Sequence, residues 1–424
     1  MEENFLTKNG IEIYGYKNPG LHGFYISLFL RAGSMYESEN DSGITHFFEH
    51  VAIRNVNKQM DGKLYSELDR LGVEFNASTY AEMVQFYISG ASDKFSFAAK
   101  TLSRVFSPII LTSEELGAER RRIKAEIREA DDKSSLSFFT NGIVHADTSL
   151  SRNITGTLSG VGRITAKRLE DYRKRILTKE NVFFYVTGNF TSEDINSLTS
   201  AVEEYAFNEG TCVHENIAPL SQNHFRREPR VYVKNGDFTS VRFTFDLDMK
   251  KLSVPVTDLI YDMLLSGYNS RLFIELSEHR GLFYDIGGAV ERYRNVGELY
   301  FSYELRGKDV LEAVSLTVDI LKSFKEAPPS PDEMMRASYV DNAGMLYDDS
   351  RDLNFTMAYD NHVMKLGYSS LEARTAAYAS VTPEEVRRAA CEIFTPENLT
   401  LTIKCNTKKI NTAEIENIIS RLKI

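Results

Sequence analysis

The chain has 424 residues, of which 42% are hydrophobic and 26% are charged. At about 150 residues per domain, this length predicts two or three domains, and the composition excludes a disordered, collagenous or low-complexity chain. The net charge of −10 includes no basic block longer than Arg120, Arg121 and Arg122, so we expect no nucleic-acid partner. No stretch approaches the roughly 20 apolar residues that cross a bilayer, so we expect no membrane partner either.

Cysteine usage bears on the compartment. The three cysteines, Cys212, Cys391 and Cys405, form no CxxC pair, so the sequence predicts neither a disulfide framework nor a thiolate metal cage. The acidic, polar start of the chain does not look like a targeting segment. These features together predict a cytoplasmic protein.

The first half of the chain alternates strand patterns with helical patterns. Strands are expected at 24–33, 73–80 and 83–90, and helices at 93–106 and 113–132. Because neighbouring strands are joined by short turns and the helices are collected between them, we expect an α+β layer.

A cluster of metal-binding side chains precedes the second of these strands. In GITHFFEHVAI, His46 and His50 are one helical turn apart on the same face, and Glu49 lies beside them. Two imidazoles at this spacing can meet one Zn²⁺, and a neighbouring carboxylate can accept a proton from a zinc-bound water. The alternative is a pair of histidines that serve only the packing of a core helix.

A catalytic zinc needs a third protein ligand, and the helix at 113–132 offers two carboxylates. Glu119 and Glu126 are seven residues apart, so both point the same way, whereas the arginine run between them is expected to point elsewhere. Each glutamate, taken alone, could equally be a solvated surface charge.

An internal repeat sets the domain organisation. Residues 164–187 align without a gap on 381–404, and both copies predict a helix, a T-x-E-N turn and a β-branched strand. A second echo pairs the segment from Lys63 with the segment from Arg271 if one inserted residue is allowed. We therefore expect two homologous domains at 1–210 and 229–424, joined by an extended linker at 211–228, with the zinc motif in the first domain only.

The HxxEH motif, with a glutamate pair 69 and 76 residues beyond His50, resembles the pitrilysin/insulinase family of zinc metallopeptidases. The segments AGS at 32–34, NAST at 76–79 and ITGT at 154–157 are similar to other landmarks of that family. The resemblance implies that His46, His50 and Glu126 ligate one zinc ion per chain. It further implies that Glu49 is the general base and that Glu119 is a supporting carboxylate.

The same resemblance implies a fold and a substrate class. Family members pair two α/β-sandwich domains into one half of a clamshell, and a second half closes the chamber around a peptide or an unfolded segment. The peptide adds as a strand at a sheet edge, which the segment 75–80 resembles here, with Asn76 and Ala77 at the substrate-binding positions. The bland alternative for this segment is an ordinary hairpin strand.

One position departs from the family pattern. The other half of a family member supplies a tyrosine and an arginine that hold the scissile carbonyl. Tyr284 occupies the tyrosine position, but Ser277 stands at the arginine position, seven residues earlier. Arg280 is three residues out of register, so it either substitutes for the missing guanidinium or is a solvated residue at a helix end.

These features predict a zinc endopeptidase that acts on peptides or precursor segments as a homodimer or as a heterodimer with a paralogous subunit. An alternative is a catalytic subunit that is inactive alone and needs its paralogue, for example in bacteriocin or modified-peptide maturation. A further alternative is a peptide-binding subunit without catalysis. A hydrolase of small molecules lacks support, because the chain has no GxSxG, Walker-type or dinucleotide motif.

Overall fold

The computed structural model describes most of the chain and divides it into two compact units. It describes residues 2–133, 135–146, 148–207, 209–210, 213, 220, 228–233, 238–283, 286–293, 295–347, 350–406 and 410–423. Unit 1 comprises Met1–Lys133, Arg152–Ala218 and Gly344–Leu371, and unit 2 comprises Ser134–Ser151, Pro219–Ala343 and Glu372–Ile424. Each unit thus contains a segment from the other half of the sequence. The domains expected from the sequence, 1–210 and 229–424, were continuous and did not include these segments. Most of the expected linker at 211–228 lies outside the described residues.

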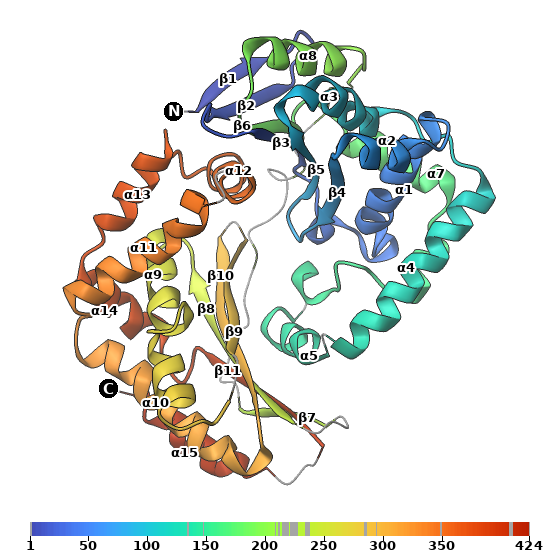
Figure 1. Ribbon diagram of the computed structural model, residues 1–424. Coiled ribbons are helices and arrows are strands. Elements are labelled where there is room, and N and C mark those ends of the chain that lie inside the picture. The colour runs from blue at the N-terminus through green and yellow to red at the C-terminus, as the bar shows by residue number, and fades with distance from the viewer. Residues whose placement is uncertain are drawn as a thin grey trace. The chain divides into compact units, whose positions relative to one another are not determined.

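Unit 1 is built on a six-stranded sheet with the order β1-β2-β6-β3-β5-β4, so β4 is an edge strand (Figure 1). All neighbouring strands are antiparallel except β2 and β6, which run parallel. The strands are β1 (Glu3–Leu6), β2 (Glu12–Lys17), β3 (Gly23–Leu30), β4 (Glu74–Thr79), β5 (Val84–Ala91) and β6 (Val182–Gly188). The three strands predicted in this half are confirmed as β3, β4 and β5.

One face of the unit 1 sheet carries most of its helices. These are α1 (Ile44–Gln59), α2 (Leu64–Leu71), α3 (Phe95–Ser103), α4 (Ser113–Lys133), α6 (Leu158–Arg163), α7 (Ala166–Ile176) and α8 (Ser192–Glu203). Short 3₁₀ turns lie at η1 (Ser34–Tyr36), η2 (Glu39–Asp41), η3 (Ser92–Lys94) and η4 (Arg104–Phe106). Phe24, Ile26 and Leu28 of β3 point into the core beneath these helices, as the period of two in a strand requires.

The opposite face of this sheet is covered by the segment from the second half of the sequence. It holds α12 (Arg351–Ala358) and a π-helical turn, η9 (Tyr359–Val363). Asn354 of α12 is fully buried: its Nδ2 donates to the Tyr185 carbonyl at 2.9 Å, and its Oδ1 accepts from the Ser27 hydroxyl at 2.6 Å. Leu353 and Met357 pack beside it on Phe29 and Phe183, so β3 is buried on both faces.

Unit 2 repeats the arrangement with a five-stranded sheet of order β7-β11-β8-β10-β9. The parallel pair is β7 and β11, and the other neighbours are antiparallel, which reproduces the pattern β2-β6-β3-β5-β4 of unit 1. The strands are β7 (Arg230–Val233), β8 (Thr239–Asp248), β9 (Ile286–Tyr293), β10 (Val296–Leu305) and β11 (Leu399–Cys405).

The helices of unit 2 follow the same logic. They are α5 (Ser135–Val144), α9 (Val254–Leu265), α10 (Val310–Glu326), α13 (Leu371–Ala379), α14 (Pro383–Ile393) and α15 (Thr412–Ser420), with 3₁₀ turns η5 (Ser149–Ser151) and η8 (Gly307–Asp309), and α11 (Pro331–Tyr347) begins here. The segment that contains α5 is held to the sheet by buried polar contacts: the Thr140 and Thr402 hydroxyls are 2.7 Å apart, and His145 Nε2 lies 3.1 Å from Glu298 Oε2.

The predicted repeat is confirmed element by element. Helix α7 and strand β6 of the first copy correspond to α14 and β11 of the second, with the same lengths and the same spacing. Thr165 and Thr382 begin the two helices, and each hydroxyl accepts a backbone N–H of the first turn. The α+β class with two similar units is therefore confirmed.

The inserted residue of the second echo also has a structural counterpart. The position that the regular helix α2 holds in unit 1 is taken in unit 2 by a π-helical segment, η7 (Phe273–Glu278). A π turn encloses one residue more than an α turn, so it can accommodate the inserted residue.

Asp262 on α9 makes the stability of unit 2 depend on pH. Its side chain is 5% exposed and accepts the Ser266 hydroxyl at 2.6 Å, and burial raises the pKa of Asp262 to about 7. The folded state then binds more protons than the unfolded state between about pH 4 and 7, so the free energy of unfolding falls as pH rises through that window. We expect Asp262→Asn to remove a slope of about 1 kcal/mol per pH unit in urea unfolding measured from pH 5 to 7.5. If the free energy of unfolding of the wild type and of Asp262→Asn changed equally with pH, this role of Asp262 would be contradicted.

Among the residues that the structure describes, the helices include none that is both long and apolar enough to span a bilayer.

Candidate metal centre

Helix α1, which carries the HxxEH motif, starts at an unusual backbone turn. Gly43 precedes the helix with φ 88°, a conformation that glycine adopts without strain. The buried carboxylate of Glu37 accepts the backbone N–H groups of Gly43 and Thr45, each at 2.8 Å, and so satisfies donors that the first turn leaves open. The start of α1 is thereby fixed two residues before His46.

A second glycine lies against this turn. Gly156, in the ITGT stretch singled out in the sequence, has φ 76°, and a Cβ placed on it would lie 2.4 Å from the Gly43 Cα. The two backbones therefore approach so closely that neither position has room for a side chain.

The three expected ligands converge in unit 1. His46 and His50 come from α1 and Glu126 from α4, and their candidate ligand atoms lie within 4.8 Å of one another. Glu126 Oε2 is 3.3 Å from His50 Nε2 and 3.8 Å from His46 Nε2. Ligand atoms at about 2.1 Å from a tetrahedral zinc are about 3.4 Å apart, so this donor set fits zinc with little adjustment.

The protonation state of His46 also suits a metal. Its side chain is 13% exposed, and burial, followed by the neighbouring His50, lowers the pKa of His46 to about 4. The imidazole is therefore neutral at neutral pH, as a ligand must be.

Glu49 lies beside the histidines with its carboxylate held by a strand. It is 8% exposed, and the Thr79 hydroxyl of β4 donates to Glu49 Oε2 at 2.5 Å. Burial raises the pKa of Glu49 above its ordinary value, although the Thr79 hydrogen bond opposes this. A carboxylate with a raised pKa is a stronger proton acceptor, which suits a general base.

Glu119 contacts the other side of His50. Its Oε2 lies 3.4 Å from His50 Nδ1, and Arg54 Nη1 donates to its Oε1 at 2.5 Å. The hydrogen bond with His50, together with Arg54, lowers the pKa of Glu119. These contacts place Glu119 beside an expected ligand, and its supporting role stays a prediction.

The expectation that the arginines between Glu119 and Glu126 point elsewhere is wrong for Arg122. Its Nε lies 3.6 Å from Glu126 Oε1, because a residue three positions after Glu119 returns to the same helix face. Arg120 points away as expected, since its guanidinium donates to the Val161 and Ile164 carbonyls.

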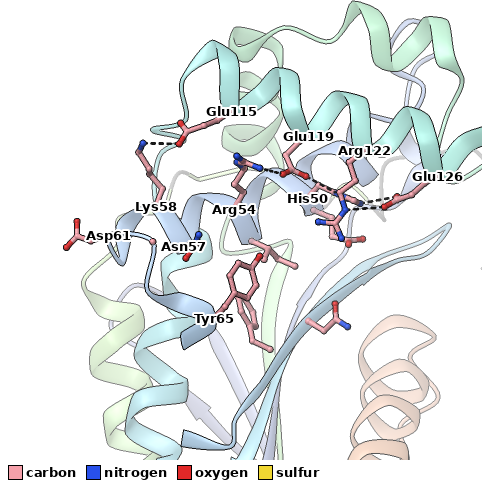
Figure 2. Close-up of a pocket in the computed structure, with 15 residues that line it drawn as sticks. His50, Arg54, Asn57, Lys58, Asp61, Tyr65, Glu115, Glu119, Arg122 and Glu126 are labelled. Atoms are coloured by element: carbon pink, nitrogen blue, oxygen red, sulfur yellow. Dashed lines mark hydrogen bonds and ion pairs between the residues drawn. The ribbon is translucent and has the colours of Figure 1, made fainter. Parts of the chain in front are cut away.

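A cavity of about 1150 Å³ opens beside the candidate metal centre and is lined by Glu49, His50, Glu119 and Glu126. Figure 2 shows α1 and α4 along its wall, with Arg54 directed toward Glu119 and Arg122 toward Glu126. The cavity extends along α1 and past its end to Gly62, and it is also lined by Tyr65, Phe75 and Asn76. Ala77, the neighbour of Asn76 on β4, packs against the core instead. The substrate-binding roles of Asn76 and Ala77 stay predictions.

The segment expected to hold a substrate carbonyl lies in unit 2. Tyr284 is outside the described residues. The Ser277 hydroxyl donates to the Phe283 carbonyl at 3.1 Å, and Arg280 pairs with Glu275 and Glu312, each at 3.5 Å. The Arg280 guanidinium is thus engaged within its own unit, which favours the interpretation of Arg280 as a helix-end residue.

Two side chains that contact the cluster were not singled out from the sequence. Thr79 belongs to the NAST landmark, but no sequence pattern indicated that its hydroxyl contacts Glu49. Arg54 follows His50 by four residues, so the spacing that pairs the two histidines also places it on the same face. That periodicity was the available signal for Arg54, whereas the Thr79 contact depends on how β4 packs on α1.

Family models match the chain in two consecutive parts. The model described as insulinase, peptidase family M16, matches residues 16–158, and the model described as the M16 inactive domain matches 163–338. The first match contains the HxxEH motif, Glu119 and Glu126.

Similar proteins carry peptidase names. An uncharacterized zinc protease of Rickettsia felis is 26% identical over 357 residues, which is 80% of this chain and 82% of the relative. One from Bacillus subtilis is 22% identical and covers 94% of this chain and 97% of its own. The rat mitochondrial-processing peptidase subunit beta is 25% identical over half of this chain and 43% of its own.

Solved structures share the fold. A protease from Helicobacter pylori superposes with a TM-score of 0.83 at 16% identity, over 96% of this chain and 99% of that one. The periplasmic protease PqqL of Escherichia coli gives 0.80 at 17% identity, over 99% of this chain and 50% of that one. The family models, the relatives and the motif agree, and the chain belongs to the insulinase family of zinc peptidases, peptidase family M16.

Proposed function

We propose that the chain is a zinc-dependent endopeptidase that cleaves peptides or unfolded precursor segments. The observation that carries this proposal is the convergence of His46, His50 and Glu126 within 4.8 Å, with the buried carboxylate of Glu49 beside them. Two imidazoles, one carboxylate and an adjacent base form the donor set of a zinc hydrolase.

In this proposal the ligands and the base have separate tasks. A zinc ion held by His46, His50 and Glu126 would acidify a water molecule and polarise the scissile carbonyl. Glu49 accepts the proton from the attacking water and later delivers it to the leaving amine. The Thr79 hydroxyl occupies one oxygen of Glu49, which leaves the other oxygen for that proton.

The substrate is proposed to lie along the free edge of the unit 1 sheet. Strand β4 has a neighbour on one side only among the described strands, so an extended peptide can pair with its other side. Thr79 at one end of β4 contacts Glu49, and Phe75 and Asn76 nearer the other end line the cavity. Strand pairing satisfies the peptide backbone, so it tolerates varied side chains.

The active form is proposed to contain two such chains, or this chain and a paralogue, around a closed chamber. Support comes from PqqL, whose chain is matched over 50% of its length, as expected if this chain corresponds to one half. The same inference applies to the mitochondrial-processing peptidase, whose name describes a subunit. The cytoplasmic location expected from the sequence stays a prediction.

The test is hydrolysis of a quenched fluorescent peptide library by the purified chain loaded with zinc, with a chelated sample beside it. We expect cleavage that the chelator abolishes and added zinc restores. Cleavage that survives full removal of zinc would contradict the proposal. So would the absence of peptide cleavage by the zinc-loaded chain both alone and with its paralogue.

A second candidate is a catalytic subunit that is inactive without its paralogue. The observation that favours it is the state of Ser277 and Arg280: a serine stands where the resemblance places an arginine, and the nearby Arg280 guanidinium is paired with Glu275 and Glu312. In the same assay, this candidate predicts no cleavage by the chain alone and chelator-sensitive cleavage after the paralogue is added.

A further inference from the structure

Glu119 and Glu126 of α4 are held in the same way. Each gives one carboxylate oxygen to a histidine and the other to an arginine. Glu119 Oε2 faces His50 Nδ1 while its Oε1 accepts from Arg54, and Glu126 Oε2 faces His50 Nε2 while its Oε1 faces Arg122. Figure 2 shows the line of interactions from Arg54 through Glu119 toward His50.

The two arginines differ in how firmly they hold their partners. Arg54 Nη1 is 2.5 Å from Glu119, and the side chains are 36% and 7% exposed. Arg122 Nε is 3.6 Å from Glu126, and those side chains are 68% and 37% exposed. A short contact to a buried carboxylate fixes its orientation, whereas a long contact between exposed groups is largely screened by solvent.

We propose that Arg54 is a positioning residue of the metal centre, acting through Glu119 on His50. Arg54 fixes the plane of the Glu119 carboxylate, so that Oε2 faces His50 Nδ1. An acceptor at Nδ1 keeps the proton on that nitrogen and leaves Nε2, the nitrogen that faces Glu126, free to bind the metal. The inference rests on the proposed zinc site, because it assigns Nε2 of His50 as the ligand atom.

The helices supply a matched control. One turn beyond Arg54, Lys58 Nζ pairs with Glu115 at 2.9 Å, so it links the same two helices. That pair is 43% and 23% exposed, and Glu115 contacts neither histidine in the described structure. A substitution at Lys58 therefore removes an ion pair between α1 and α4 but leaves every residue that contacts His50 unchanged.

The experiment measures the zinc dissociation constant by competition with a chromophoric chelator. Groups that orient a ligand typically change metal affinity 10- to 100-fold, so we expect Arg54→Met to weaken zinc binding by about tenfold or more. Lys58→Met is expected to stay within about twofold of the wild type. Thermal unfolding of the metal-free proteins is recorded in parallel, to separate weaker zinc binding from a damaged fold.

A double-mutant cycle tests the route through Glu119. If Arg54 acts only through Glu119, then Glu119→Gln and the double variant Arg54→Met/Glu119→Gln bind zinc equally well. The double variant buries no unpaired carboxylate, so it remains informative even if Arg54→Met alone does not fold. Additive losses, or an affinity of Arg54→Met equal to that of the wild type, would overturn the inference.

The same measurement separates this inference from the proposed function. A wild-type chain that binds no zinc overturns both. A chain that binds zinc and shows the expected cycle, yet cleaves no peptide under any partner condition, overturns the peptidase and leaves the role of Arg54 supported.

Discussion

Replacing Glu49 with glutamine is expected to lower kcat for peptide cleavage by about 10²- to 10⁴-fold, the usual contribution of a general base. Glutamine has nearly the same shape and can still accept the Thr79 hydroxyl, but it cannot take a proton from water. Because Glu49 is not among the converging ligand atoms, zinc content and KM are expected to change little. Steady-state kinetics with metal analysis of the same samples measures all three quantities.

The control for this variant is Glu114→Gln on α4. Glu114 is exposed and does not line the cavity, so the loss of its charge is expected to leave kcat within about twofold of the wild type. A Glu49→Gln protein that cleaves at the wild-type rate would exclude Glu49 as the base. Loss of zinc from that variant would mean that Glu49 also contributes to the metal site.

Gly156→Ala is expected to cost about 2–5 kcal/mol of unfolding free energy, the largest stability effect predicted here. The added Cβ would meet the Gly43 backbone at 2.4 Å, where no flexible side chain can move aside, and φ 76° is strained for alanine. Because Gly43 directly precedes α1, which carries His46 and His50, we also expect weaker zinc binding. Urea unfolding and chelator competition measure the two effects.

Gly72→Ala separates strain from collision. Gly72 also has a positive φ, 63°, but a Cβ there would meet nothing within 4 Å. We expect it to cost about 1 kcal/mol, from backbone strain alone. Equal losses at the two glycines would show that the contact between Gly156 and Gly43 carries no special cost.

Much of the fold was predictable because it is periodic or repeated. The strands β3, β4 and β5 follow from local strand patterns bounded by turns, and the second copies of α7 and β6 follow from the aligned repeat. The sequence did not predict that each sheet is covered on its second face by a segment from the other half of the chain. These segments are Gly344–Leu371 in unit 1 and Ser134–Ser151 in unit 2. Asn354 illustrates the reason: it is a polar residue on a short helix, and its partners Ser27 and Tyr185 are far away in the sequence.

The candidate site divides in the same way. His46, Glu49 and His50 share one helix, so their spacing alone brings them together, and Glu126 required the family resemblance. The prediction for Arg122 was wrong because it gave all three consecutive arginines one common orientation. Successive side chains on a helix point about 100° apart, so the three cannot share one. The Thr79 contact depends on tertiary packing that no local pattern encodes.

The claim at the centre of this account is that His46, His50 and Glu126 hold one zinc ion. A zinc K-edge X-ray absorption spectrum of the protein loaded with one equivalent of zinc tests it most directly. We expect two imidazole nitrogens at about 2.0–2.1 Å, the remaining ligands oxygen at about 2.0–2.2 Å, and one imidazole fewer in His50→Ala. A spectrum with sulfur at about 2.3 Å, or one that His50→Ala leaves unchanged, would contradict the claim.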